Sequence, residues 1–252
     1  MLMKEQHQKE IEYFVISVLG LLFGENNVKD WKRKLVIVAT LEIIFGVTAT
    51  FDLLTGGRLA VWGVRPRKLP SLLFIAIAPF IQASFGQFLL NVIPFGVLAA
   101  FVLMRERGIT IFVVLSLMNI VMGGLFVWAF GRLSVTYVGA SGFVFAYFGY
   151  LLLYGPLTRE FRATVISVLV FICYGGIFWA LFEIDDSSNV YEANLAGFFV
   201  GVGLGILDAK TNIIAKDTFE EIADGEERER LTRSNDAAQQ VVDHDNILDQ
   251  DV

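Results

Sequence analysis

Long apolar runs separated by short polar segments dominate the chain from about residue 35 to residue 207. About 20 apolar residues in an α-helix cross the hydrocarbon core of a bilayer. The pattern therefore predicts six membrane-spanning helices, at 35–51, 85–104, 109–130, 138–154, 163–182 and 191–207. Strands of a membrane barrel would alternate between polar and apolar positions, and these runs do not. The sequence thus predicts an all-α membrane protein built as a six-helix bundle.

Two further apolar stretches are not predicted to span the bilayer. Residues 11–23 are too short, contain Glu12 and follow a charged segment, which favours a helix lying in the membrane interface. Residues 69–82 contain Pro70 and Pro79 and end in polar residues. We therefore expect the second stretch to be a half-submerged loop rather than a straight helix.

Composition agrees with a membrane protein. The chain has 55% hydrophobic and 18% charged residues, where a soluble domain carries roughly 25% charged residues. This composition excludes a soluble enzyme and a nucleic-acid binder. The segment from residue 208 onward holds 13 acidic and 5 basic residues. We therefore divide the chain into an N-terminal segment (1–34), a membrane domain (35–207) and an acidic tail (208–252).

Basic residues in the short loops predict how the protein is oriented, since cytoplasmic loops carry an excess of Lys and Arg. With six spans, the basic clusters at 29–34, 105–107, 159–162 and 210–216 fall on one side of the membrane. We expect an integral, multi-pass protein with both termini in the cytoplasm. The exception is the long first outer loop, which contains Arg58, Arg65, Arg67 and Lys68.

Small residues predict a close contact between the fourth and sixth spans. Gly197, Gly201 and Gly205 recur every four residues and so share one face of the sixth span. Gly142 and Ala146 form a matching groove on the fourth. Small residues let membrane helices approach closely, so we expect these two faces to meet.

Three motifs, in order along the chain, resemble those of the rhomboid intramembrane serine proteases. They are Gln-Phe-Leu-Leu-Asn at 87–91, Gly-Ala-Ser-Gly at 139–142 and Tyr-Glu-Ala-Asn-Leu-Ala-Gly at 191–197. The resemblance covers about residues 35–207 and implies a rhomboid-like bundle of six transmembrane helices. It places Ser141 at the nucleophile position and Asn194 at the base position. Gln87 and Asn91 take the positions that stabilise the oxyanion.

The chain departs from the family at two of these positions. The base position holds Asn194 and the first oxyanion position holds Gln87, where the family has histidine in both. The chain's two histidines, His7 and His244, lie outside the predicted spans. A serine hydroxyl needs a base to become a nucleophile, and a carboxamide is barely basic. Because losing the base costs a soluble serine protease about a million-fold in turnover, we expect Ser141, Asn194, Gln87 and Asn91 to form an uncharged polar cluster instead.

Few other residues are candidates for a catalytic base or a metal site. Glu192 lies about 200° around the helix from Asn194, so the two cannot both face Ser141. Glu42 lies in the first span, and no Lys lies within a predicted span. Cys173 is expected to pack in the core. The sequence offers no cysteine metal cluster, so we expect neither a metal ion nor a cofactor.

Three functions remain open. The first is a pseudoprotease that binds transmembrane segments of client proteins in the lipid bilayer without cleaving them. The second is an active serine endopeptidase that uses Ser141 and an unrecognised base. The third is a transporter. The only feature of the sequence that favours it is Glu42 within a predicted span.

Overall fold

The computed structural model describes residues 2–82, 84–176 and 191–248. The chain forms two compact units, Met1–Asp208 and Ala209–Val252. In the described residues the secondary structure is helical, apart from one isolated antiparallel bridge between Val64 and Tyr137. The all-α prediction is confirmed.

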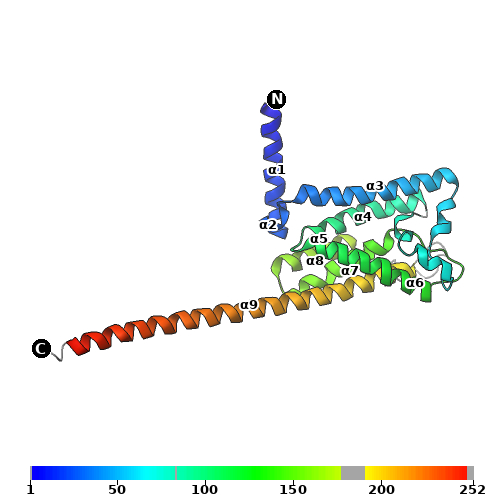
Figure 1. Cartoon of the computed structure of the whole chain (residues 1–252). Helices are drawn as coiled ribbons and strands as arrows, with labels where there is room; N and C mark the ends of the chain where they lie inside the picture. Colours follow the sequence, from blue (N-terminus) through cyan, green and yellow to red (C-terminus); the bar gives the residue numbers. More distant parts are fainter. Residues whose placement is uncertain (1, 83, 177–190, 249–252) are drawn as a thin grey trace. The chain divides into compact units, whose positions relative to one another are not determined.

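Nine α-helices are described, together with three 3-10 turns and one π-helical turn (Figure 1). The α-helices are α1 (Leu2–Phe23), α2 (Glu25–Val28), α3 (Trp31–Thr55), α4 (Phe85–Leu103), α5 (Gly108–Met118), α6 (Gly124–Phe130), α7 (Ser141–Thr158), α8 (Phe161–Tyr174) and α9 (Tyr191–Leu248). The other turns are η1 (Arg58–Trp62), η2 (Leu69–Phe74), η3 (Ala78–Phe80) and the π-turn η4 (Asn119–Gly123).

Several of these helices have the length and the apolar composition of membrane-spanning segments. Within the described residues, four segments are long and apolar enough to cross a bilayer: Trp31–Thr55, Phe85–Leu103, Gly108–Phe130 and Tyr191–Ala223. The fourth and fifth predicted runs lie on α7 and α8, which are shorter. The end of the fifth run, in 177–190, lies outside the described residues. The stretch 69–82 is not a straight helix but contains η2 and η3, as its prolines indicated.

Helix boundaries differ from the predictions at two points that matter for the site. The fourth run was predicted from residue 138, but α7 begins at Ser141, because Gly139 has a φ of 122° that ends helical geometry there. The third run is interrupted by the π-turn η4 between α5 and α6. Such turns insert one extra residue and are frequent at functional sites.

Helix α7 forms the centre of the bundle. Most of its residues are buried, and it packs against α4, α5 and α8, while α4 packs in turn against α3. Figure 1 shows α3, α4 and α7 stacked in that order. Buried aromatic rings of α4, α5 and α7 fill the space between them: Phe95 lies 5.7 Å and Phe112 5.5 Å from Tyr147, centroid to centroid. Such ring pairs add to the area that each side chain buries.

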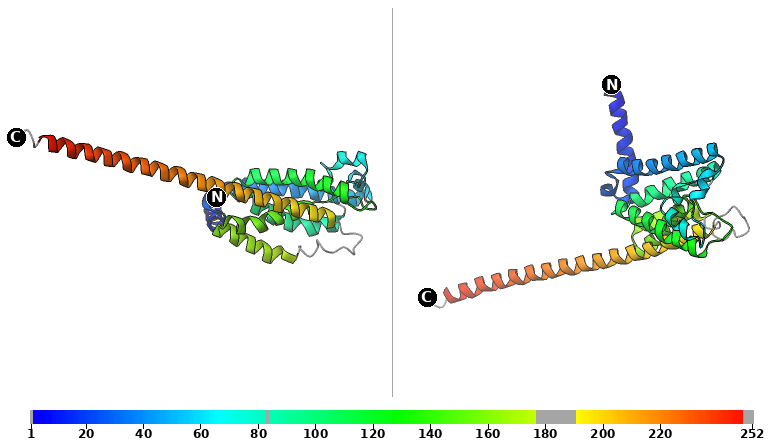
Figure 2. Two further views of the ribbon diagram at one scale, coloured as in Figure 1. Left: turned by 90° about the horizontal axis from the view of Figure 1, so that it is seen from below. Right: turned by 45° about the vertical axis from the view of Figure 1, so that its right-hand side comes forward.

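The first turns of α9 pack closely on α7, as the glycine spacing predicted (Figure 2). A Cβ added at Gly197 would meet the carbonyl of Gly142, and one at Gly201 would meet the carbonyl of Ala146. Gly205 lies against Tyr150 in the same way. The predicted contact between these two helices is therefore confirmed, and it places the start of α9 beside the start of α7.

The long loop between α3 and α4 closes the bundle near the start of α7. Val64 exchanges two backbone hydrogen bonds of 2.9 Å with Tyr137, and the Gly139 amide donates to the carbonyl of Ala78 at 3.1 Å. Val64, Ala78, Tyr137 and their buried neighbours form a small apolar core there. This core fixes the segment that leads into Ser141.

Candidate functional site

Ser141 is the first residue of α7 and is 9% exposed. The positive end of the helix dipole lies at this position and favours negative charge. Gly139, two residues earlier, cannot be replaced easily: its φ is positive, and a Cβ there would lie 2.9 Å from Nε2 of Gln87. The glycine therefore lets α7 start directly beside the side chain of Gln87.

Two of the predicted polar residues come from α4. Gln87 lies in its first turn, where its own backbone amide is capped by the Ser84 hydroxyl at 3.0 Å. Asn91 follows one turn later and so shares a face with Gln87. Nδ2 of Asn91 is buried and has no hydrogen-bond partner among the described residues.

Asn194 lies in the first turn of α9 and is 5% exposed. The carbonyl of Ala193, the residue before Asn194, lies 3.8 Å from where a Cβ on Gly142 would be. Gly142 follows Ser141, so the helix turns that carry Ser141 and Asn194 lie next to each other. Within the described part of the chain, no hydrogen bond joins Ser141 to Asn194, and Oδ1 of Asn194 is buried without a partner. The structure thus brings α4, α7 and α9 together, but the expectation that their polar groups satisfy one another is wrong for Asn91 Nδ2 and Asn194 Oδ1.

The carboxylate of Glu192 is paired with Arg132. It accepts hydrogen bonds from Nε and Nη2 of Arg132, at 2.8 and 3.3 Å, and the guanidinium also lies 4.9 Å from the ring centroid of Tyr191. The backbone amide of Arg132 donates to Oη of Tyr137 at 2.9 Å. The pairing of Arg132 with Glu192 was not predicted, because the two residues lie 60 positions apart in the sequence.

Asn119 was also missed. It lies in η4, is 5% exposed, and its amide is 3.3 Å from where a Cβ on Gly142 would lie. Together with Gly139, Gly142 and Ala193 it lines a small cavity of about 50 Å³ beside the site. An asparagine in the middle of the apolar run 109–130 was the available signal, since an intramembrane polar residue needs a reason.

Gln82, which precedes α4, is the third side-chain amide with an unsatisfied buried atom. It is fully buried, and neither its Oε1 nor its Nε2 has a partner among the residues that the structure describes. Buried polar groups normally find a hydrogen bond, so each of these unsatisfied amides needs an explanation.

The remaining sequence candidates lie elsewhere. Oε1 of Glu42 on α3 lies against Gly96, nine residues beyond Gln87 and therefore about 13 Å further along α4. Cys173 is exposed on α8 rather than packed in the core, so that prediction was wrong.

The chain is similar to known proteins. The family model of the rhomboid domain matches residues 70–211. An uncharacterized protein of Mycobacterium tuberculosis is 30% identical over 172 residues, which cover 66% of this chain and 71% of that protein. An uncharacterized protein of Mycobacterium leprae is 25% identical over 179 residues, covering 68% and 70% of the two chains. The chain carries the apolar helices of an integral membrane protein and belongs to the rhomboid family.

Proposed function

We propose that this rhomboid is a pseudoprotease that binds transmembrane client proteins without cleaving them. The observation that carries the proposal is Asn194, a carboxamide at the position of the catalytic base. An amide oxygen accepts hydrogen bonds but does not take a proton at neutral pH. Ser141 then stays a neutral hydroxyl, which is a poor nucleophile.

Among the residues that the structure describes, the alternative bases are already paired or lie elsewhere. The sequence has no histidine between His7 and His244. Glu192 is held by Arg132, and Glu42 contacts a distant turn of α4. Lys34, at the beginning of α3, donates to the Asn27 carbonyl at 2.6 Å near the other end of the bundle.

The unsatisfied amides support a binding role. Asn91 offers a buried donor and Asn194 a buried acceptor. A peptide group of an extended client segment presents one carbonyl and one N–H, which complement this pair. Each charge-free hydrogen bond formed there adds about 1 kcal/mol net, and leaving the groups unpaired costs more.

The proposed orientation in the membrane determines the side on which Ser141 lies. Six crossings with both termini in the cytoplasm place the Ser141 end of α7 on the outer side, where it meets the end of a single-span client entering sideways through the lipid. The basic residues of the loops at 105–107 and 159–162 support this orientation.

Photo-crosslinking in vesicles tests the binding role. The natural chain, carrying a photoreactive residue at Ala193, is reconstituted with a model single-span protein, and the crosslinked product is quantified. We expect Asn91→Leu to lower the yield several-fold, while the same change at the exposed Asn26 leaves it unchanged. Equal yields from both variants would contradict a client site at the amides.

The alternative is an active endopeptidase, which the intact Gly-Ala-Ser-Gly motif and the helix N-terminus at Ser141 favour. A fluorophosphonate probe distinguishes the two functions. We expect no labelling of the natural chain at Ser141, whereas labelling that Ser141→Ala removes would establish an activated serine.

A further inference from the structure

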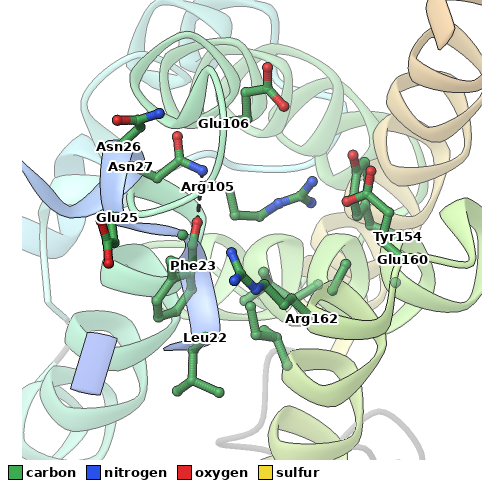
Figure 3. A pocket seen from close by; sticks show the side chains of 15 residues that line it. Leu22, Phe23, Glu25, Asn26, Asn27, Arg105, Glu106, Tyr154, Glu160 and Arg162 are labelled. Atoms are coloured by element: carbon green, nitrogen blue, oxygen red, sulfur yellow. Dashed lines mark hydrogen bonds between the residues drawn. The ribbon is translucent and has the colours of Figure 1, made fainter. Parts of the chain in front are cut away.

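A cavity of about 500 Å³ lies at the opposite end of α7 from Ser141 (Figure 3). Its walls come from the end of α1, from α2, from the loop between α4 and α5, and from the facing turns of α7 and α8. The volume falls in the range of small-molecule sites, roughly 300–1,000 Å³. The catalytic motifs contribute no residue to it.

Two arginines extend into this cavity. Figure 3 shows the guanidinium groups of Arg105 and Arg162 in its middle, the first from the loop between α4 and α5 and the second from the first turn of α8. Arg105 donates to Oη of Tyr150 at 2.9 Å and stacks 3.2 Å from the ring centroid of Tyr154. Nη1 of Arg162 lies beside Gly24, 3.1 Å from where a Cβ would be. A guanidinium group matches the geometry of a phosphate, and this cavity offers two.

Hydrogen bonds to neighbouring side chains fix the position of Arg105. Tyr150, which accepts its hydrogen bond, donates in turn to Oδ2 of Asp208 at 2.8 Å. Oδ1 of the same carboxylate pairs with Nη2 of Arg107 at 3.1 Å. A guanidinium fixed by such partners loses little side-chain entropy when it binds an anion.

Carboxylates surround the arginines. Glu25, Glu106 and Glu160 line the cavity, and in Figure 3 those of Glu25 and Glu106 lie towards its edges. Three carboxylates would repel a ligand that carries negative charge alone. A ligand with a phosphate and a nearby ammonium group matches both sets of side chains.

The cavity lies where the apolar helices end. Helices α4 and α7 finish beside it, at Leu103 and Thr158, and α5 and α8 begin there. In a bilayer this is the level of the lipid headgroups, where basic pockets between helices bind them. Buried Phe23, Leu151 and Ile166 supply an apolar wall on which lipid can pack.

We propose that this cavity binds the phosphoethanolamine headgroup of a phospholipid. Arg105 and Arg162 hold the phosphate, and Glu106 and Glu25 pair with the ammonium group. The site is independent of the proposed client-binding function, because no residue is shared between them.

Native mass spectrometry of the full chain tests the proposal. The delipidated protein is offered equal amounts of phosphatidylethanolamine, phosphatidylglycerol and phosphatidylcholine, and retained lipid is measured. We expect phosphatidylethanolamine to be retained best. Arg162→Gln should weaken its retention by about tenfold, the value of one charge-assisted contact, and Glu106→Gln should shift the preference towards phosphatidylglycerol. Arg159→Gln, at an exposed arginine three residues before Arg162 and outside the cavity, is the matched control.

Equal retention of the three lipids would overturn the proposal, as would unchanged retention in Arg162→Gln. Since Arg162 and Glu106 are both exposed, neither change threatens folding. Soluble phosphoethanolamine identifies the source of the headgroup. If the soluble compound alone raises the unfolding midpoint as far as the lipid does, the ligand is the free compound and the lipid assignment fails.

Discussion

Arg132 and Glu192 lie 60 residues apart in the sequence, yet Nε of the arginine donates to Oε1 of the glutamate at 2.8 Å. The side chain of Glu192 is 7% exposed and that of Arg132 is 29% exposed. The pair joins the loop after α6 to the first turn of α9, two residues before Asn194. It therefore fixes the start of the helix that carries Asn194 and engages the carboxylate of Glu192.

Breaking this pair should destabilise the protein. Arg132→Gln leaves a buried carboxylate without its partner, at a cost of about 2 kcal/mol, because hydrogen bonds to charged groups are worth about 1.5–3 kcal/mol. Thermal unfolding in detergent measures the loss. Arg132→Gln combined with Glu192→Gln should recover much of it, and Arg58→Gln, an exposed arginine in the first outer loop, should change little. A double variant as unstable as the sum of the single variants would show that the two residues are not coupled.

The glycine contact between α7 and α9 should tolerate no added methyl group. A Cβ at Gly201 would meet the Ala146 carbonyl, so Gly201→Ala forces the helices apart at a cost of about 1–3 kcal/mol. Gly203 has nothing within 4 Å of its Cβ position and is the matched control. Gly203→Ala should be neutral or stabilising by about 0.5–1 kcal/mol, since alanine favours helix. Unfolding midpoints that fall equally in both variants would contradict the close contact.

Tyr137, which lies in the loop before α7, should make stability depend on pH at the alkaline end. Burial raises the pKa of its phenol above the ordinary value, although the hydrogen bond from the Arg132 amide opposes the shift. Below pH about 10 the phenol is neutral in both the folded and the unfolded chain, so its contribution is complete. As the pH rises further, the unfolded chain ionises first, and this contribution is lost towards the raised folded pKa.

The variant Tyr137→Phe removes that titration. At pH 8 its unfolding midpoint should be lower than that of the natural chain, because a hydrogen bond is lost. Above pH 10 the midpoint should fall less steeply than that of the natural chain. Tyr13→Phe, at an exposed tyrosine of α1, is the control and should keep the natural slope. An unchanged slope in Tyr137→Phe would show that another group causes the alkaline loss.

Local pattern was enough to predict much of the fold. Apolar runs of bilayer length gave the positions of the helices, and the glycines at 197, 201 and 205 gave the face that α9 presents to α7, since both depend only on spacing along one helix. The three elements that meet at the site were predicted instead from the resemblance of the motifs around Ser141, Gln87 and Asn194 to those of the rhomboid proteases.

Long-range and backbone features could not be predicted in this way. The pairing of Arg132 with Glu192 depends on how distant segments fold together. The π-turn that brings Asn119 to Gly142 has no local sequence signature. The unsatisfied atoms of Asn91 and Asn194 depend on exact side-chain packing, which is why the expected self-satisfied cluster was wrong in part.

The measurement that tests the account most directly is cleavage of a model single-span protein in reconstituted vesicles. The natural chain is compared with Ser141→Ala, with Gln87→His combined with Asn194→His, and with all three changes together. We expect no cleavage by the natural chain, and cleavage by the histidine variant that the added Ser141→Ala abolishes, because the variant restores the two histidines that the site lacks. Cleavage by the natural chain that Ser141→Ala removes would contradict the assignment as a pseudoprotease.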